Sequence, residues 1–106
     1  WLRYRGDQEM TPAELKQSAL KDARPPAGLG EAALALWYLK KGDWEKSHAI
    51  AQDLHDAHGA WIHALLHLVE GDLSNARYWF AEAGRPSVKP AQADALWDEI
   101  ATGVLA

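Results

Sequence analysis

Two histidines and a carboxylate lie one helical turn apart in the segment AWIHALLHLVEGD, residues 60–72. His67 follows His63 by four residues and Glu70 follows His67 by three, so an α-helix places the three side chains on one narrow stripe. Two imidazoles at this spacing can chelate one metal ion. A histidine beside a carboxylate can also do acid–base chemistry. The segment is therefore a candidate polar cluster for a metal or a small ligand.

Burial in a helical stack is the other interpretation of this stripe, and we prefer it. A zinc hydrolase of the His-Glu-x-x-His type needs a glutamate directly after its first histidine, and Ala64 occupies that place. A metal ion would also require a third ligand from another helix. The available histidines are His48, His55 and His58. In a stack, His63 and His67 would instead hydrogen-bond to polar neighbours. The candidate neighbours are Glu70, Asp43 and Asp72.

Composition limits what else the chain can be. Its 106 residues suit one domain, with 48% hydrophobic and 25% charged residues. The net charge of −4 and the lack of a basic run longer than Lys40-Lys41 argue against a nucleic-acid partner. Cysteine is absent, which excludes a thiolate metal site and a cysteine nucleophile. No signal-peptide pattern and no apolar run of about 20 residues occurs. We expect a cytoplasmic protein with no membrane contact.

Helix-start and helix-stop signals predict an all-α fold of about six short helices. Thr11-Pro12-Ala13-Glu14 is a capping box with proline in the first turn, and Pro25-Pro26 stops the helix that it starts. Gly42 ends one helix, and a turn is expected at His58 or Gly59. The expected helices cover about 11–24, 30–41, 43–55, 59–70, 72–84 and 90–104. No segment alternates apolar and polar residues for long enough to predict a strand.

The chain repeats itself at an offset of 29 residues. ALALWYLKKGDWEKSHA aligns with IHALLHLVEGDLSNARY, so that Gly42-Asp43 pairs with Gly71-Asp72. Each unit is a helix, a Gly-Asp turn and a second helix. Glycine supplies the positive φ that ends the first helix, and aspartate caps the next one. Each unit is therefore predicted to be an antiparallel helical hairpin with almost no loop.

The second unit resembles a tetratricopeptide repeat. The matching residues are Ala64 seven before the turn glycine, Ala76, Phe80, Ala83 and Pro86. In the first unit Ala35, Tyr38 and Gly42 fit, and the resemblance covers about 31–86. The period of 29 is shorter than the 34 residues of that family. The resemblance implies a right-handed stack of antiparallel helical hairpins, a scaffold used for many binding roles.

The same resemblance places Trp61, Leu65 and Leu68 on the concave, ligand-facing surface of the stack. Either the C-terminal helix, which carries Trp97, covers that surface, or it is an exposed apolar patch that binds a partner. Tyr78, Trp79 and Phe80 are consecutive, so one helix face cannot bury all three. Phe80 is expected in the core, whereas Tyr78 and Trp79 reach another helix or line a groove. Arg77 lies among these aromatic residues, where it either shields their surface or grips a carboxylate.

We therefore expect a helical scaffold that binds a protein segment or self-associates as a homodimer, through its aromatic and leucine residues. The contact residues would be Trp61, Leu65, Leu68, Arg77, Tyr78 and Trp79. No enzyme activity, catalytic residue or cofactor is predicted. The alternative is a small-molecule- or metal-binding protein, or an enzyme, that uses His63, His67 and Glu70. Residues 1–10 are expected to be a disordered or non-native extension, because the only methionine is Met10, and 11–106 a single helical domain.

Overall fold

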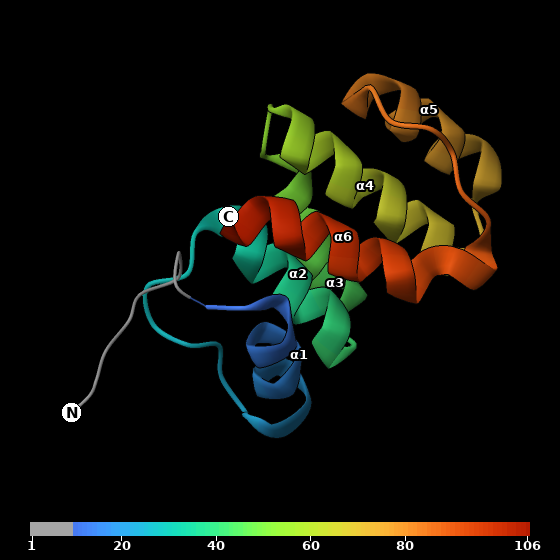
Figure 1. Cartoon of the computed structure of the whole chain (residues 1–106). Coiled ribbons are helices and arrows are strands. Elements are labelled where there is room, and N and C mark those ends of the chain that lie inside the picture. Colours follow the sequence, from blue (N-terminus) through green and yellow to red (C-terminus); the bar gives the residue numbers. More distant parts are fainter. Residues whose placement is uncertain (1–9) are drawn as a thin grey trace.

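The structure, a computed structural model, describes residues 10–106 (Figure 1). The helices are α1 (Pro12–Lys21), α2 (Glu31–Lys41), α3 (Trp44–Gln52), α4 (Ala57–Glu70), α5 (Leu73–Ala83) and α6 (Ala93–Leu105), with a 3-10 turn, η2, at Pro90–Gln92. Over residues 10–106 there are six α-helices and no strand, which confirms the predicted all-α class. The predicted extension lies outside this part of the chain, except for Met10, which packs against the core.

Both Gly-Asp turns form as the sequence predicts. Gly42 and Gly71 end α2 and α4 with φ of 101° and 89°, values that favour glycine. The next residues, Asp43 and Asp72, accept a hydrogen bond from a backbone N–H in the first turn of α3 and α5. The chain therefore reverses twice with minimal loops, giving the hairpins α2–α3 and α4–α5.

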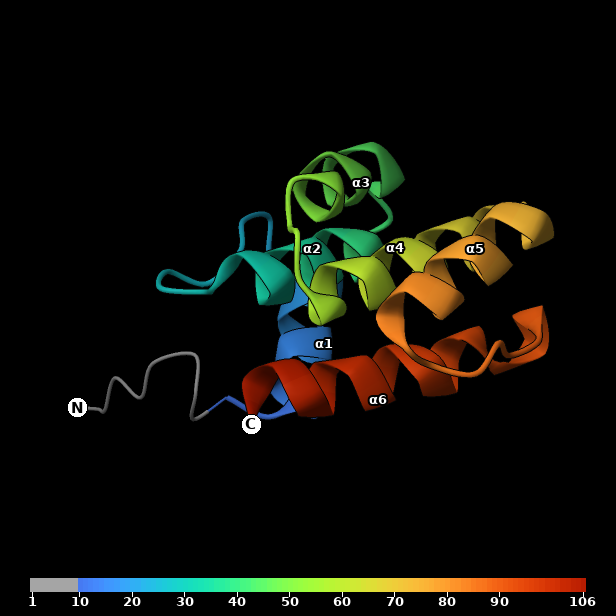
Figure 2. The ribbon, with the colours of Figure 1, turned by 90° about the horizontal axis from the view of Figure 1, so that it is seen from above.

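The hairpins pack side by side, and the last helix closes one side of them. Helix α3 contacts α4, and α6 contacts both α2 and α4. Figure 2 shows α2 and α4 lying between α3 on one side and α6 on the other. Trp97 of α6 is buried and donates a hydrogen bond from Nε1 to the backbone carbonyl of Leu36, at 3.0 Å. This bond joins the C-terminal helix to the first hairpin.

The surface that the repeat resemblance would leave concave is covered, with Arg85 over Trp61 and Trp97 of α6 near Leu65. Trp61, Leu65 and Leu68 are only 4%, 1% and 2% exposed and belong to the hydrophobic core. In this structure these three side chains have no surface to offer a partner. Of the two alternatives for this surface, the covered one is therefore found. Phe80 is also buried, as its position in α5 predicts.

Some predicted helix ends were wrong. Helix α4 begins at Ala57 instead of Gly59, because the Asp56 side chain caps it and accepts a hydrogen bond from the Gly59 N–H at 2.8 Å. A Cβ on Gly59 would lie 2.5 Å from Leu54 Cβ. The glycine therefore lets the first turns of α4 pack closely against Leu54, which lies in the loop before the helix. Helix α1 ends at Lys21, before Arg24, and α3 ends at Gln52.

No helix of the described part of the chain has the length and apolar character needed to cross a membrane.

Candidate metal-binding site

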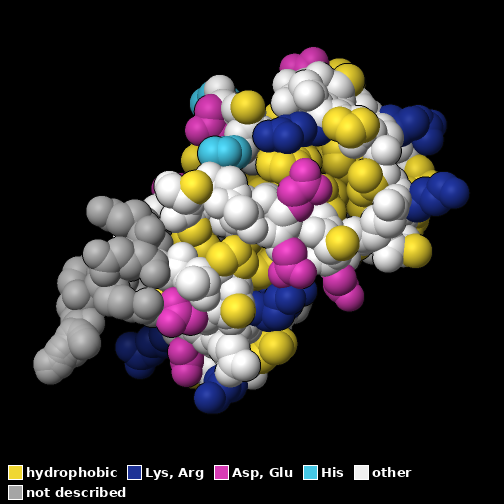
Figure 3. Space-filling view, in the orientation of Figure 1, with side chains coloured by type: hydrophobic (Ala, Val, Ile, Leu, Met, Phe, Trp, Pro, Cys, Tyr) yellow, Lys and Arg dark blue, Asp and Glu magenta, His cyan; other side chains and the backbone are white. Residues whose placement is uncertain are grey.

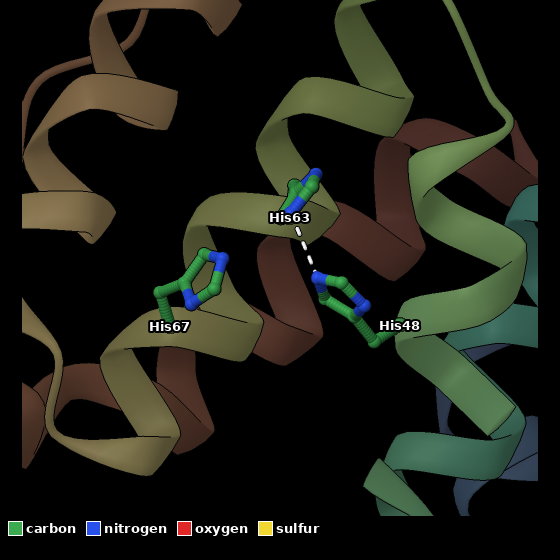
Figure 4. A group of neighbouring side chains, drawn as sticks. All are labelled: His48, His63 and His67. Carbon is green, nitrogen blue, oxygen red and sulfur yellow. Dashed lines mark hydrogen bonds between the residues drawn. The ribbon is translucent and has the colours of Figure 1, made fainter. Parts of the chain in front are cut away.

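Three histidines from two helices meet at the interface between α3 and α4. His48 comes from α3, and His63 and His67 come from successive turns of α4. One ring nitrogen from each lies within 4.8 Å of the others, and the Nε2 atoms of His48 and His63 are 3.0 Å apart. Figure 4 shows the rings directed at the space between them. We call these residues the three-histidine cluster.

Hydrogen bonds to neighbouring helices fix α3 in place. Trp44 donates a hydrogen bond from Nε1 to the carbonyl of Leu66 in α4, at 2.8 Å. On the other side of α3, the Ser47 hydroxyl donates to the carbonyl of Ala35 in α2, at 2.7 Å. Ser47 is completely buried, so its small side chain lets α3 approach α2 closely. Together these contacts hold α3 so that His48 faces α4.

Two indole rings form walls against the imidazoles. Trp44 lies parallel to His48, with ring centroids 4.8 Å apart and an interplanar angle of 9°. Trp79 of α5 lies parallel to His63, at 4.0 Å and 9°. Parallel stacking on a large indole restricts the rotation of each imidazole. Three helices, α3, α4 and α5, thus define the ring orientations in the cluster.

The third histidine is oriented by a carboxylate. His67 Nδ1 and Glu70 Oε2 are 2.6 Å apart, so Nδ1 carries the proton and donates it to the carboxylate. Its Nε2 is then free to accept a proton or bind a metal ion. A carboxylate behind a histidine fixes the tautomer and increases the basicity of the ligand nitrogen, an arrangement common in metal sites. The predicted partnership of His67 with Glu70 is therefore confirmed.

Asp72 and Asp43, the other predicted partners, have different positions. Asp72 lies near His67 and Glu70. One oxygen of each carboxylate and one ring nitrogen of His67 fall within 4.8 Å of one another. The Asp72 side chain also caps α5. Asp43 caps α3 through the N–H of Lys46 and takes no part in the cluster.

Burial lowers the pKa of two of the three imidazoles, His63 and His48. Desolvation, together with the neighbouring His48 and His67, lowers the pKa of His63 to about 4. Desolvation, and then His67, also lower the pKa of His48, against a smaller opposing effect of Glu70 and Glu45. His63 and His67 are only 7% and 6% exposed, which confirms their predicted burial. Neutral imidazoles with available lone pairs are the form that binds metal ions.

A polar pocket adjoins the cluster at His63. Its volume is about 470 Å³, and it lies where the end of α3 and the start of α4 face α5. The lining includes His63 and Trp79 together with His55, Asp56 and Glu82. Within residues 10–106, no fourth histidine or carboxylate joins the three histidines within ligand distance. An ion held there would therefore keep a coordination position for water or an outside ligand, as catalytic zinc sites do.

The remaining predicted residues lie outside the cluster. The guanidinium of Arg85 lies over Trp61, with Cζ 3.9 Å from the centroid of the indole ring. Tyr78 is 57% exposed and meets Trp79 edge-on. Arg77 is exposed and lines a separate groove on α5.

His55 and His58, considered as third ligands, do not join the cluster. His58 instead lies beside α6, near Gly103.

Sequence reasoning did not single out His48 from the other available histidines, and it did not assign Trp79 to the cluster. The signal for His48 was its spacing from Trp44, because a tryptophan and a histidine four residues apart share one face of α3. For Trp79 the signal was its position among three consecutive aromatic residues, since one of them had to leave the α5 core face.

Comparison with known proteins supplies no family for this chain. No family model matches it, and no curated protein and no solved structure matches it either. The functional argument therefore rests on the geometry of residues 10–106.

Proposed function

We propose that this protein binds a transition-metal ion of the zinc class through His48, His63 and His67. The observation that carries the proposal is the convergence of their nitrogens within 4.8 Å at a buried helix interface. Zinc–nitrogen bonds of about 2.0–2.1 Å in a tetrahedron place ligand nitrogens roughly 3.3 Å apart. The 3.0 Å between His48 Nε2 and His63 Nε2 is already near this value. These two nitrogens share a hydrogen bond, so an ion bound to both would displace the proton between them to an Nδ1 atom or to solvent.

The donor set narrows the choice of metal. Three neutral imidazoles favour zinc, copper or nickel, whereas magnesium and calcium prefer oxygen ligands. The outer hydrogen bond of His67 to Glu70 supplies the carboxylate support that such sites use. The pocket beside His63 supports an ion that remains open to a small outside ligand. Zinc is our first choice because it accepts tetrahedral nitrogen ligation without a redox requirement.

We favour metal binding over the binding of a protein segment for a specific reason. Three of the residues that the segment-binding hypothesis uses, Trp61, Leu65 and Leu68, are buried in the core and offer a partner almost no surface. Tyr78 is exposed, but a single exposed aromatic residue is ordinary on a protein surface. The helical hairpins then serve to hold the histidines in position.

We also infer that the two hairpins are shortened units of the tetratricopeptide type, stacked with a right-handed twist. The 29-residue repeat supports this inference, as do the left-handed glycines at equivalent turns and the contact between α3 and α4. In this arrangement the second helix of one unit meets the first helix of the next. That junction is where the three-histidine cluster lies.

Calorimetric titration of the metal-free chain with Zn²⁺ tests the proposed function. We expect one ion per chain, and we expect His48→Ala to weaken binding by about 100-fold, because one of three ligands is lost. His48 is only partly buried, so its removal should leave the fold intact. His58→Ala is the matched control, since His58 is also partly buried but lies beside α6, outside the cluster and outside the pocket lining. Zinc binding that survives His48→Ala unchanged would exclude the site.

A further inference from the structure

An apolar groove lies between α5 and the segment that leads to α6. It encloses about 240 Å³, and its lining residues are Leu68, Leu73, Ala76, Arg77, Phe80, Ser87, Val88, Lys89 and Pro90. The lining side chains Leu68, Ala76 and Phe80 are buried, so the floor of the groove is apolar. Figure 3 shows hydrophobic side chains in the recess between α5 and α6, with Lys or Arg side chains at its edge.

Two exposed cationic side chains line this groove, and neither forms an ion pair with a carboxylate of the described residues. Arg77 projects from α5 and Lys89 from the segment before η2, and both lie among the lining residues. Neither one takes part in an ion pair with another residue of the described chain, whereas Lys16 and Lys40 do. The whole chain carries a net charge of −4, whereas the two unpaired cations give the groove a positive charge beside its apolar floor.

We propose that this groove binds a small molecule with a carboxylate head and a short apolar tail. A carboxylate would accept charge-assisted hydrogen bonds from the Arg77 guanidinium, a geometry that allows two parallel bonds, and from Lys89. The tail would lie on Leu73 and Val88, which are 42% exposed and partly buried respectively, and would remove their apolar surface from water. The volume is below the roughly 300–1,000 Å³ typical of drug-sized ligands, so a medium-chain fatty acid fits better than a long one.

The inference is independent of the metal proposal. The groove residues and the three-histidine cluster have no member in common. The groove has an apolar surface and two cationic side chains in its lining, the two kinds of contact that the proposed ligand needs. A carboxylate compound could, however, also ligate a bound zinc ion. The test is therefore run on metal-free protein in the presence of a chelator.

Octanoate, octanol and octylamine are the probes, because they share a tail and differ in the head group. We expect saturable binding of one octanoate per chain, at least tenfold weaker binding of octanol, and no binding of octylamine. Amide chemical-shift changes should map to α5 and to residues 87–90. Equal binding of octanoate and octanol, or shifts centred on His63, would overturn the proposal.

Charge-removal variants test the head-group contact. Arg77→Gln and Lys89→Gln should each weaken octanoate binding by about tenfold, because each removes one charge-assisted contact. Arg24→Gln removes an exposed arginine elsewhere on the chain and should leave octanoate binding unchanged. Zinc binding should be unchanged in all three variants, so a failure here is distinguishable from a failure of the metal proposal. An equal loss in the Arg24 control would show that only the net charge matters and would overturn the site.

A charge placed in the groove tests the tail contact. Leu73 lines the groove at the first position of α5, where an aspartate favours the helix macrodipole and should not harm folding. Leu73→Asp should reduce octanoate binding by at least tenfold through repulsion and loss of apolar surface. Ser74→Asp adds the same charge one residue later, outside the groove lining, and is the matched control. Octanoate binding that persists in Leu73→Asp would place the ligand elsewhere.

Discussion

The indole of Trp79 lies parallel to the imidazole of His63, with ring centroids 4.0 Å apart and an interplanar angle of 9°. These residues belong to α5 and α4, which form one helical hairpin. The contact brings a third helix into the three-histidine cluster, whose ligands come only from α3 and α4. Trp79 therefore acts as a positioning residue, because it restrains a candidate ligand and shields it from water.

Trp79→Leu should loosen this restraint. We expect zinc affinity to fall by about tenfold, the range seen when the outer support of a metal ligand is removed. In the metal-free protein, the pKa of His63 should rise toward its ordinary value, because its burial decreases. Calorimetry and an NMR titration of the imidazole measure the two effects. Tyr78→Leu, on the exposed face of α5, is the control and should change neither quantity.

Glu70→Gln should weaken zinc binding through His67. The variant keeps the shape of the side chain but removes the negative charge that supports the imidazole, 2.6 Å away. We expect about a tenfold loss of zinc affinity by calorimetry. Glu99→Gln, which changes an exposed carboxylate on α6, should have no effect. A loss of similar size in the Glu99 variant would indicate a long-range charge effect instead of a specific contact.

Zinc should stabilise the folded chain. Binding to the folded state alone adds about 2.7 kcal/mol to the free energy of unfolding when the free zinc concentration is 100 times Kd. For a domain of this size, that corresponds to a rise in Tm of roughly 10–20 °C. Thermal unfolding followed by circular dichroism measures the shift, and a chelator should reverse it. At the same zinc concentration His48→Ala, with about 100-fold weaker binding, should gain only about 0.4 kcal/mol, a rise in Tm of about 2–3 °C.

Acid should destabilise the metal-free chain before its carboxylates titrate. The pKa of His63 is about 4 in the folded state and 6.5 in the unfolded chain, so between these values the unfolded state binds more protons. The free energy of unfolding should therefore be highest above pH 6.5. It should fall as pH decreases toward 4, by on the order of 2–3 kcal/mol from His63. The lowered pKa of His48 acts in the same direction.

Urea denaturation across this pH range, in the presence of a chelator, measures the effect. The titratable groups that contact His63 are His48 and His67, and Glu70 acts through His67. His55, Asp56 and Glu82 line the pocket that adjoins His63. His63→Gln keeps a polar side chain of similar size but cannot titrate. Its free energy of unfolding should change much less between pH 6.5 and 4. An unaltered pH dependence in this variant would assign the effect to other groups.

Two glycine-to-alanine changes should have opposite signs. In α4, a Cβ on Gly59 would lie 2.5 Å from both Cβ and the carbonyl oxygen of Leu54, so Gly59→Ala should destabilise by about 1–3 kcal/mol despite its better helix propensity. In α6, a Cβ on Gly103 would meet only His58 Nε2 at 3.7 Å, an ordinary contact. Gly103→Ala should stabilise by about 0.5–1 kcal/mol. Urea denaturation at pH 7 compares the two variants.

The sequence by itself determined the helices and the turns between them. Capping aspartates, turn glycines and prolines act over three or four residues, so the hairpins could be predicted at Gly42-Asp43 and Gly71-Asp72. The stripe of His63, His67 and Glu70 followed from the helical period alone. The error at Gly59 arose because glycine serves both to end helices and to permit close packing, and only the position of Leu54 distinguishes the two.

Tertiary structure decided what the helices do together. His48 reaches His63 because Trp44 and Ser47 fix α3 between its neighbours, and such contacts join residues 12 to 22 positions apart. No local rule gives the rotation of one helix against another. The burial of Leu65 near Trp97 likewise depends on where a helix more than 20 residues later in the chain packs. Local hydrogen bonding therefore specified the elements, whereas long-range side-chain packing specified the cluster and the buried face.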